Sequence, residues 1–242
     1  LSCVRRVKDV PTAGAYIMTD KADNQITAFY PGAMNAECRM KNVELWKNAK
    51  MAIVSPGNLQ DMQALLALYK KQGVPYIYDP GQAIPALSGA QLRAGITGAK
   101  VFISNDYELA MVLKKTGWKK PDMLKRVEVL VTTLGEKGSI IEINPKSQIP
   151  NLKQIQNSKF QIQKFVISPA KPKNILDPTG AGDAYRAGFI IGLLMGLPYD
   201  KVGKLASVVA AYTVEKYGTQ THSFTWREVL KRYRENYKES LL

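Results

Sequence analysis

The sequence predicts an α/β fold in which helices cover a mostly parallel sheet. Short apolar runs alternate with longer segments of helical periodicity through most of the chain. The chain has 242 residues, and 45% of them are hydrophobic. A chain of this size and composition can bury the core of one domain, which we expect to span residues 1–242.

The N-terminal part predicts a hairpin, because residues 15–20 and 25–30 are strand-like and a polar turn at residues 21–24 separates them. Strands of the main sheet are expected at the apolar runs 51–54, 75–78, 100–103, 127–134 and 139–143. Helical patterns fall between these runs, at residues 60–71 and 107–115. Strands that alternate with helices in this way are typical of a parallel sheet.

The C-terminal part starts with a polar stretch, residues 144–173, which is rich in Lys, Gln, Asn and Pro. We interpret it as a surface excursion with one strand at residues 160–167. Helices are then predicted over residues 181–195, 197–217 and 225–237.

The net charge of +14 suggests a nucleic-acid partner, but the basic residues are scattered and form no RNA- or DNA-binding motif. No specific nucleic-acid partner is therefore expected. Residues 187–197 form the longest apolar stretch, which is too short for a bilayer, and the N-terminus lacks a signal-peptide pattern. Two cysteines, Cys3 and Cys38, cannot form a zinc cluster. We expect a cytoplasmic protein without membrane association.

The segment from Asp177 to Phe189, DPTGAGDAYRAGF, is the most informative part of the chain. It predicts a glycine turn that leads into a helix opening at Ala181, whose free N–H groups and positive dipole end favour an anion. Gly180 and Gly182 would allow close approach of a ligand, and we expect a glycine-specific backbone at Gly182. Asp183 could accept a proton beside that anion. The alternative is an ordinary glycine turn with an Asp favoured by the dipole.

We interpret Asp177 as the end of a strand that leads into this turn, and two further motifs also follow apolar runs. Asn105-Asp106-Tyr107-Glu108 follows the run ending at Ile103, and Thr132-Thr133-Leu134-Gly135-Glu136-Lys137-Gly138 follows the run ending at Val131. In this order, the three motifs closely resemble those of the ribokinase-like (PfkB) sugar and nucleoside kinases. Residues 20–34 most resemble prokaryotic adenosine and nucleoside kinases, and the resemblance extends from about Tyr16 to Trp226.

This resemblance implies a ribokinase-like three-layer α/β/α sandwich with a small β-sheet lid, to which residues 13–34 contribute. It implies an ATP- and Mg²⁺-dependent kinase that phosphorylates the 5′-hydroxyl of adenosine or a related nucleoside, as a monomer or homodimer. A PfkB-type sugar kinase and a nucleotide-binding pseudokinase that acts as a sensor are the alternatives. Other nucleotide enzymes are disfavoured, since the chain has no Walker A, protein-kinase or dinucleotide fingerprint.

The resemblance also assigns residues to roles. Asp183 is the expected general base, with charge stabilised by the amides of Gly180, Ala181 and Gly182. ATP is expected at Asn105, Glu108, Thr133, Gly135, Gly138 and Arg186, with Glu108 holding Mg²⁺ through water. The acceptor is expected at Gln25, Phe29 and Gln220, and a monovalent cation, K⁺, at Asp177 and Thr179.

Structural interpretations remain open for some of these residues. Asn105 and Glu108 also fit a helix-capping box, Arg186 fits an ion pair, and the lone His222 fits an ordinary loop residue. The family's N-terminal part, with its Gly-Gly signature and the aspartate that holds the acceptor, has no counterpart here. We therefore expect that residues are missing before Leu1 and around Val4–Arg5, which would leave part of the acceptor pocket outside the sequence.

Overall fold

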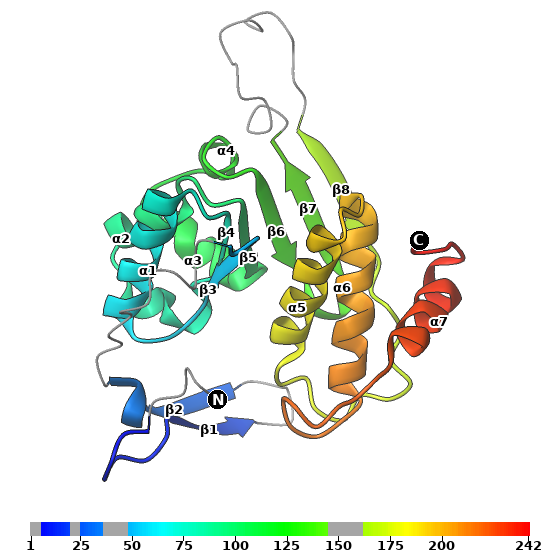
Figure 1. Cartoon of the computed structure of the whole chain (residues 1–242), viewed down its shortest axis with the longest axis horizontal. Helices are drawn as coiled ribbons and strands as arrows, with labels where there is room; N and C mark the ends of the chain where they lie inside the picture. Colours follow the sequence, from blue (N-terminus) through cyan, green and yellow to red (C-terminus); the bar gives the residue numbers. More distant parts are fainter. Residues whose placement is uncertain (1–5, 20–24, 36–47, 145–161) are drawn as a thin grey trace, which may run out of the picture.

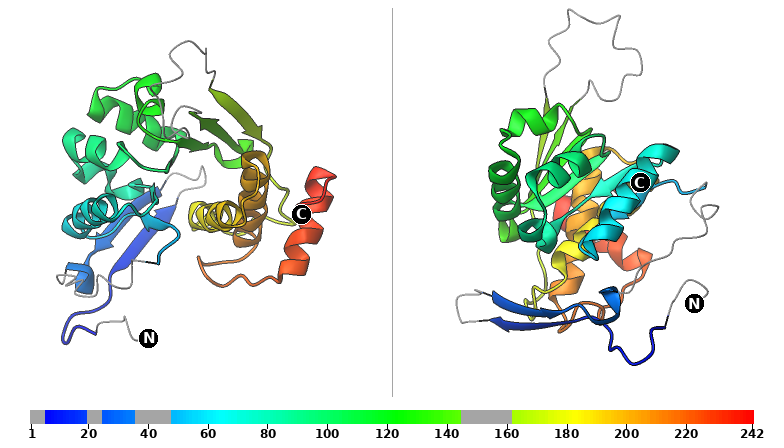
Figure 2. Two further views of the ribbon diagram at one scale, coloured as in Figure 1. Left: turned by 45° about the horizontal axis from the view of Figure 1, so that its top comes forward. Right: turned by 90° about the vertical axis from the view of Figure 1, so that its left-hand side faces the viewer.

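A six-stranded sheet lies between two layers of helices in the computed structural model of the chain (Figure 1). The structure describes residues 6–19, 25–35, 48–144 and 162–242. Helices α1 to α3 cover one face of the sheet, and α5 and α6 cover the other (Figure 2). The predicted three-layer α/β/α architecture is confirmed.

The sheet has the order β3-β4-β5-β6-β7-β8. Its parallel part comprises β3 (Ala52–Val54), β4 (Tyr76–Tyr78), β5 (Val101–Asn105) and β6 (Val129–Thr133). The central strands are continuous apolar runs because both of their faces are buried. Two antiparallel strands, β7 (Ser139–Ile143) and β8 (Gln163–Ile167), complete the sheet. The predicted strands are thus confirmed. Most are shorter than predicted, but β5 continues to Asn105 and β7 has the predicted bounds.

The first helical layer contains α1 (Leu59–Gln72), α2 (Gly89–Ile96), α3 (Asp106–Thr116) and the short α4 (Lys120–Leu124). Side chains of Phe102 and Leu130 meet those of Met62, Leu92 and Val112 in the core on this face. A 3₁₀ helix, η3 (Gly81–Ala86), precedes α2. None of η3, α2 and α4 was predicted from the sequence.

The second layer contains α5 (Ala181–Leu194) and α6 (Tyr199–Val214), and α7 (Trp226–Tyr237) packs outside α6. Helices α5 and α6 are in close contact, because a Cβ at Gly188 would lie 2.8 Å from the Cα of Ala206. Phe189 and Val202 bury their side chains against the sheet in this core. The prediction for α6 was too long at both ends. Among the described residues, no helix has the length and apolar character needed to cross a membrane.

The predicted N-terminal hairpin is confirmed as an antiparallel pair, β1 (Gly14–Thr19) and β2 (Gln25–Tyr30). A 3₁₀ helix, η1 (Gly32–Asn35), follows it. The hairpin lies apart from the main sheet, on the side where α5 begins (Figure 1). Two predictions lie outside the described residues: the turn at 21–24 and most of the excursion at 144–173.

Candidate active site

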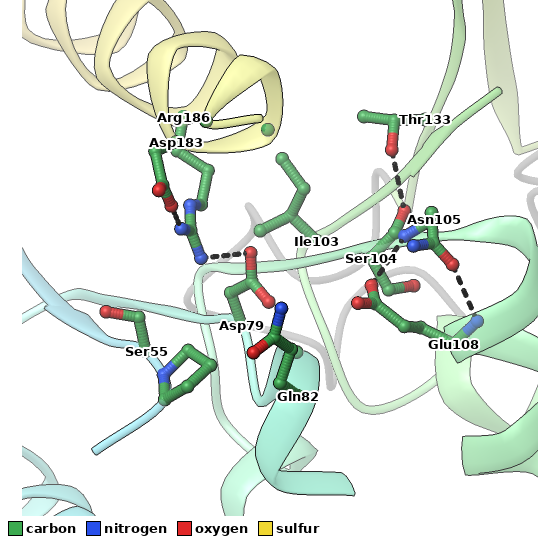
Figure 3. A pocket seen from close by; sticks show the side chains of 14 residues that line it. Ser55, Asp79, Gln82, Ile103, Ser104, Asn105, Glu108, Thr133, Asp183 and Arg186 are labelled. Atoms are coloured by element: carbon green, nitrogen blue, oxygen red, sulfur yellow. Dashed lines mark hydrogen bonds and ion pairs between the residues drawn. The ribbon is translucent and has the colours of Figure 1, made fainter. Parts of the chain in front are cut away.

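A cavity of about 420 Å³ opens where the parallel strands end and α5 begins (Figure 3). Ligands of open α/β sheets bind at this edge, because the loops after the strands converge there. The lining residues come from the ends of β3 to β6, from α3 and from the start of α5: Ser55, Pro56, Asp79, Gly81, Gln82, Ile103, Ser104, Asn105, Glu108, Thr133, Gly180, Gly182, Asp183 and Arg186. The fold therefore brings parts of all three sequence motifs to one cavity.

The turn before α5 uses its two glycines differently. Gly180 is the N-cap, with φ of 85°, and an added Cβ would lie 3.1 Å from the Cβ of Thr219. This left-handed backbone favours glycine. Gly182 lies in the helix without a positive φ, so the prediction of a glycine-specific backbone there is wrong. An added Cβ at Gly182 would meet no atom within 4 Å, which leaves space for a ligand at the cavity wall.

The first turn of α5 supplies backbone N–H groups at this wall. The Ala181 N–H donates to the Pro178 carbonyl at 3.1 Å, so the turn itself uses this amide. The amides of Gly182 and Asp183 follow in the first turn, where a helix provides no preceding carbonyl for them. Together with the positive end of the helix dipole, they favour a negatively charged group in the cavity.

Asp183 and Arg186 lie one turn apart on α5, and their side chains form an ion pair. Arg186 Nη1 also donates to Oδ2 of Asp79, the residue directly after β4, at 2.5 Å (Figure 3). Asp183 is largely exposed, with 67% of its side chain accessible, whereas only 11% of the Asp79 side chain is accessible. The ion-pair interpretation of Arg186 is therefore confirmed.

The pKa of Asp79 is raised to about 6, chiefly by burial and also by the nearby negative charge of Glu108. The Arg186 guanidinium opposes both effects, because it stabilises the charged carboxylate. Asp79, Asp183 and Glu108 thus place three carboxyl groups around a cavity that has one lining arginine.

The Asn105 and Glu108 side chains form the capping box of α3. Asn105 Oδ1 accepts from the Glu108 N–H at 2.7 Å, and Glu108 Oε2 accepts from the Asn105 N–H at 2.9 Å. Their capping interpretation is confirmed, and both residues also line the cavity. A carboxylate can accept about four hydrogen bonds, so the cap leaves acceptor capacity on Glu108 for the water shell of a metal ion.

The turn between β6 and β7 brings only one of its three predicted residues to the cavity. Thr133 lines the cavity, and its hydroxyl donates to the Ser104 carbonyl at 3.5 Å. Gly135 and Gly138 lie outside the lining, with φ of 58° and 88°. An added Cβ at Gly138 would lie 2.0 Å from the Ile167 carbonyl oxygen, so this glycine also has a packing role against β8.

Asp177 joins the loop before α5 to the loop after α6. Its Oδ1 accepts from the Thr179 N–H and its Oδ2 from the Gly218 N–H, both at 2.9 Å. A hydrogen bond from the Thr179 side chain lowers the pKa of Asp177 most, and the N–H groups of Gly218 and Thr179 lower it further. Asp177 and Thr179 lie outside the cavity lining, and the monovalent-cation site stays a prediction.

Phe29 and Gln220, two of the residues predicted to hold the acceptor, are not among the described residues that line the cavity. Phe29 lies on β2 with 53% of its surface exposed, Gln25 belongs to the same strand, and Gln220 is exposed in the loop after α6. His222 is a loop residue, as interpreted, because its Nε2 lies 3.3 Å from the Thr213 hydroxyl and its ring stacks on Phe224.

Sequence reasoning missed four polar residues among those described in the cavity lining: Ser55, Asp79, Gln82 and Ser104. Ser55 directly follows β3 and Asp79 directly follows β4. The signal that could have identified them is the one that identified Asn105, a polar residue at the end of an apolar run.

Comparison with known proteins relates this arrangement to one family. Residues 1–226 match the pfkB family of carbohydrate kinases. A nucleoside kinase of Methanocaldococcus jannaschii is 30% identical over 222 residues, which cover 91% of this chain and 67% of that protein. A nucleoside kinase of Methanothermobacter thermautotrophicus is 30% identical over 232 residues, covering 94% of this chain and 68% of that protein.

A solved structure shares the fold as well. The Burkholderia thailandensis nucleoside kinase, in complex with ADP and inosine, superimposes with a TM-score of 0.83 and 34% identity, covering 96% of this chain and 67% of that one. The described chain thus spans about two thirds of the length of these relatives. On the family match, the sequence similarity and the shared fold, this chain belongs to the pfkB family of carbohydrate kinases and is a phosphotransferase that acts on hydroxyl groups.

Proposed function

We propose that this protein transfers the γ-phosphate of ATP to the 5′-hydroxyl of a purine nucleoside, with adenosine or inosine as the acceptor. The observation that carries the proposal is the exposed Asp183 carboxylate beside the open glycine turn of α5, in one cavity with Asn105, Glu108 and Thr133. A base next to an anion site is what attack of a hydroxyl on a phosphate requires.

The nucleoside assignment rests on the resemblance of residues 20–34 and on the similarity to three nucleoside kinases. The Burkholderia enzyme holds inosine, which favours a purine base. We propose that residues 13–34 form the lid of a single kinase domain. Phe29, exposed on β2, is the candidate for stacking on the base once the lid closes.

In the proposed mechanism, Asp183 takes the proton of the 5′-hydroxyl while the hydroxyl oxygen bonds to the γ-phosphorus. The bond between that phosphorus and the ADP oxygen breaks, and ADP leaves with the bonding electrons. Gly182 leaves room for the phosphate, and the N–H groups of the first turn of α5 stabilise its transferring charge. Thr133, at the end of β6, lines the same cavity, and we propose that it contacts the triphosphate.

Mg²⁺ fits the donor set of this cavity, because carboxylate oxygens and water are its preferred ligands. Glu108 would hold the ion through water while it continues to cap α3, and Asn105 would support the same water shell. The bound ion would neutralise charge on the phosphate oxygens. K⁺ at Asp177 and Thr179 is a separate proposal, which a K⁺ titration of the reaction rate tests.

A competition assay tests the function. The full-length protein receives ATP, Mg²⁺ and equal concentrations of adenosine, inosine, ribose, fructose and fructose 6-phosphate. We expect a purine nucleoside to have the highest kcat/KM, by roughly 30- to 1000-fold over ribose, because ribose lacks the base contacts. A sugar that is phosphorylated faster than both nucleosides would refute the nucleoside assignment and favour the second candidate, a sugar kinase, which the family description supports. Phosphorylation of no acceptor would favour a nucleotide sensor.

A further inference from the structure

A chain of three charged side chains crosses the cavity, from the sheet to the helix that carries Asp183. Arg186 uses Nη1 for Asp79 Oδ2 and Nη2 for Asp183 Oδ1, so one guanidinium joins both carboxylates (Figure 3). Asp79 follows β4, and 107 positions separate it from Arg186 in the sequence. The contact therefore exists only in the folded protein, and it ties the end of β4 to the first turns of α5.

The inner pair, Asp79 with Arg186, is largely buried and hydrogen-bonded. Asp79 is 8% exposed, the Arg186 side chain is 15% exposed, and the backbone N–H of Gly81 donates to the Asp79 carboxylate. An arginine side chain loses considerable rotamer freedom when it is fixed, and burial of two charges costs free energy that their attraction only partly offsets. A buried ion pair of this kind is thus poorly explained by stability alone.

The outer pair, Asp183 with Arg186, is more accessible to solvent, because 67% of the Asp183 side chain is exposed. An exposed aspartate on a first helical turn samples several rotamers unless a partner fixes it. Arg186 fixes it through Oδ1, which leaves Oδ2 available as a proton acceptor.

We propose that Asp79 is a positioning residue for phosphoryl transfer, which acts through Arg186 to hold the Asp183 carboxylate with one oxygen free for the acceptor hydroxyl. This inference rests on the proposed kinase function and extends it to a residue that never touches the reacting atoms. When Asp79 loses its charge, Arg186 is no longer fixed on the sheet side. The guanidinium can then move with the Asp183 side chain or turn to the phosphate, so the Asp183 carboxylate loses its fixed orientation.

The test compares Asp79→Asn with the wild type in the full-length protein, using ATP, Mg²⁺ and the best acceptor from the competition assay. We expect kcat to fall by about 10- to 100-fold, the cost of a small misplacement of reacting groups. KM for ATP should change less than about threefold, since Asp79 acts on the base and not on nucleotide binding.

Glu142→Gln is the matched control. Glu142 has 11% side-chain exposure, as Asp79 does, and it pairs with Lys120. It lies opposite Leu130 on β7, away from the Thr133 end of β6 where the cavity opens. We expect this variant to lower the melting temperature without changing kcat.

Arg186→Lys and the double variant Asp79→Asn/Arg186→Gln exclude a merely structural role. Lysine keeps the charge but cannot bridge two carboxylates with a planar fork, so kcat should fall even if Asp79→Asn fails to fold. The double variant removes the largely buried charge that Asp79→Asn leaves without its partner on the sheet side, and we expect it to regain the melting temperature of the wild type while kcat stays low.

Three outcomes would overturn the inference: unchanged kcat in folded Asp79→Asn, full kcat in Arg186→Lys, or recovery of kcat together with stability in the double variant. Each of these leaves the kinase function intact, because the wild type still transfers phosphate. Absence of transfer by the wild type itself would instead refute the proposed function, and the positioning role with it.

Discussion

Replacement of Gly182 by alanine separates a ligand-binding role of the glycine turn from a structural one. The added Cβ meets no protein atom within 4 Å, and the backbone there has no positive φ. Glycine in a helix costs about 0.5–1 kcal/mol relative to alanine, so the variant should be as stable as the wild type or slightly more stable. For a chain of this size, such a gain raises the melting temperature by about 1–4 °C.

The same methyl group lies at the wall of the cavity, where we propose that the γ-phosphate binds. Displacement of the phosphate by about 1 Å should lower kcat/KM for ATP by roughly 10²-fold. The assay is initial-rate kinetics on Gly182→Ala, with differential scanning calorimetry of the same sample. Gly180→Ala provides the contrast, since its φ of 85° and the nearby Thr219 predict lost stability. Wild-type kinetics in a stable Gly182→Ala protein would refute the proposed phosphate position.

Three further predictions concern the carboxylates of the cavity. Asp183→Asn should lower turnover by about 10²–10⁴-fold with ATP affinity kept, and calorimetric titration of ATP with a rate assay checks both; a variant with more than about a tenth of wild-type turnover would remove Asp183 as the base. Glu108→Gln should raise the Mg²⁺ concentration for half-maximal rate, because the amide attracts the metal's water shell less; an unchanged Mg²⁺ titration with reduced stability would leave only the helix cap. Burial raises the pKa of Asp79 from 3.8 to about 6, so the folded state binds this proton more tightly than the unfolded chain does. As the pH falls from about 7 to about 4, protonation of Asp79 therefore adds to the stability of the folded state. The same protonation weakens the ion pair with Arg186. Arg186, Asp183 and Glu108 are the charged groups around Asp79, and the wild-type rate should fall below about pH 6 as Asp79 is protonated. This decrease in rate near pH 6 should be absent from Asp79→Asn. An identical pH profile in the two proteins would contradict the positioning role of Asp79.

The strands and the three motifs were predictable because their signals are local. Buried parallel strands are continuous apolar runs, and the motifs at Asn105 and Thr132 lie at the ends of such runs. The expected strand end before Asp177 is wrong, because Ile175 and Leu176 are exposed and belong to no strand. The α3 cap was also predictable, since the Asn105 and Glu108 spacing is that of a capping box.

Helix α2 was not predicted, although the sequence contains the capping-box residues at its start. Ser88 and Gln91 form a capping box there, but the helix has only eight residues, and its glycines, Gly89 and Gly95, weaken the helical pattern. Gly95 is needed for packing, because an added Cβ would lie 2.4 Å from the Tyr78 ring. Such tertiary requirements cannot be read from a single sequence.

Asp79 follows an apolar run, so its place at the cavity could have been predicted, but its ion pair with Arg186 joins residues 107 positions apart and leaves no local signal. The predictions for Phe29 and Gln220 depended on how the hairpin and the last loop sit against the sheet. The structure leaves both residues outside the cavity lining, so their roles stay predictions.

Identification of the product tests the central claim most directly. The full-length protein is incubated with ATP, Mg²⁺ and adenosine or inosine, and the product is examined by ³¹P NMR and mass spectrometry. The account predicts a nucleoside 5′-monophosphate formed in equal amount to ADP, with no such product from Asp183→Asn under the same conditions. Phosphate on another hydroxyl of the nucleoside, or ADP released without any phosphorylated nucleoside, would contradict it.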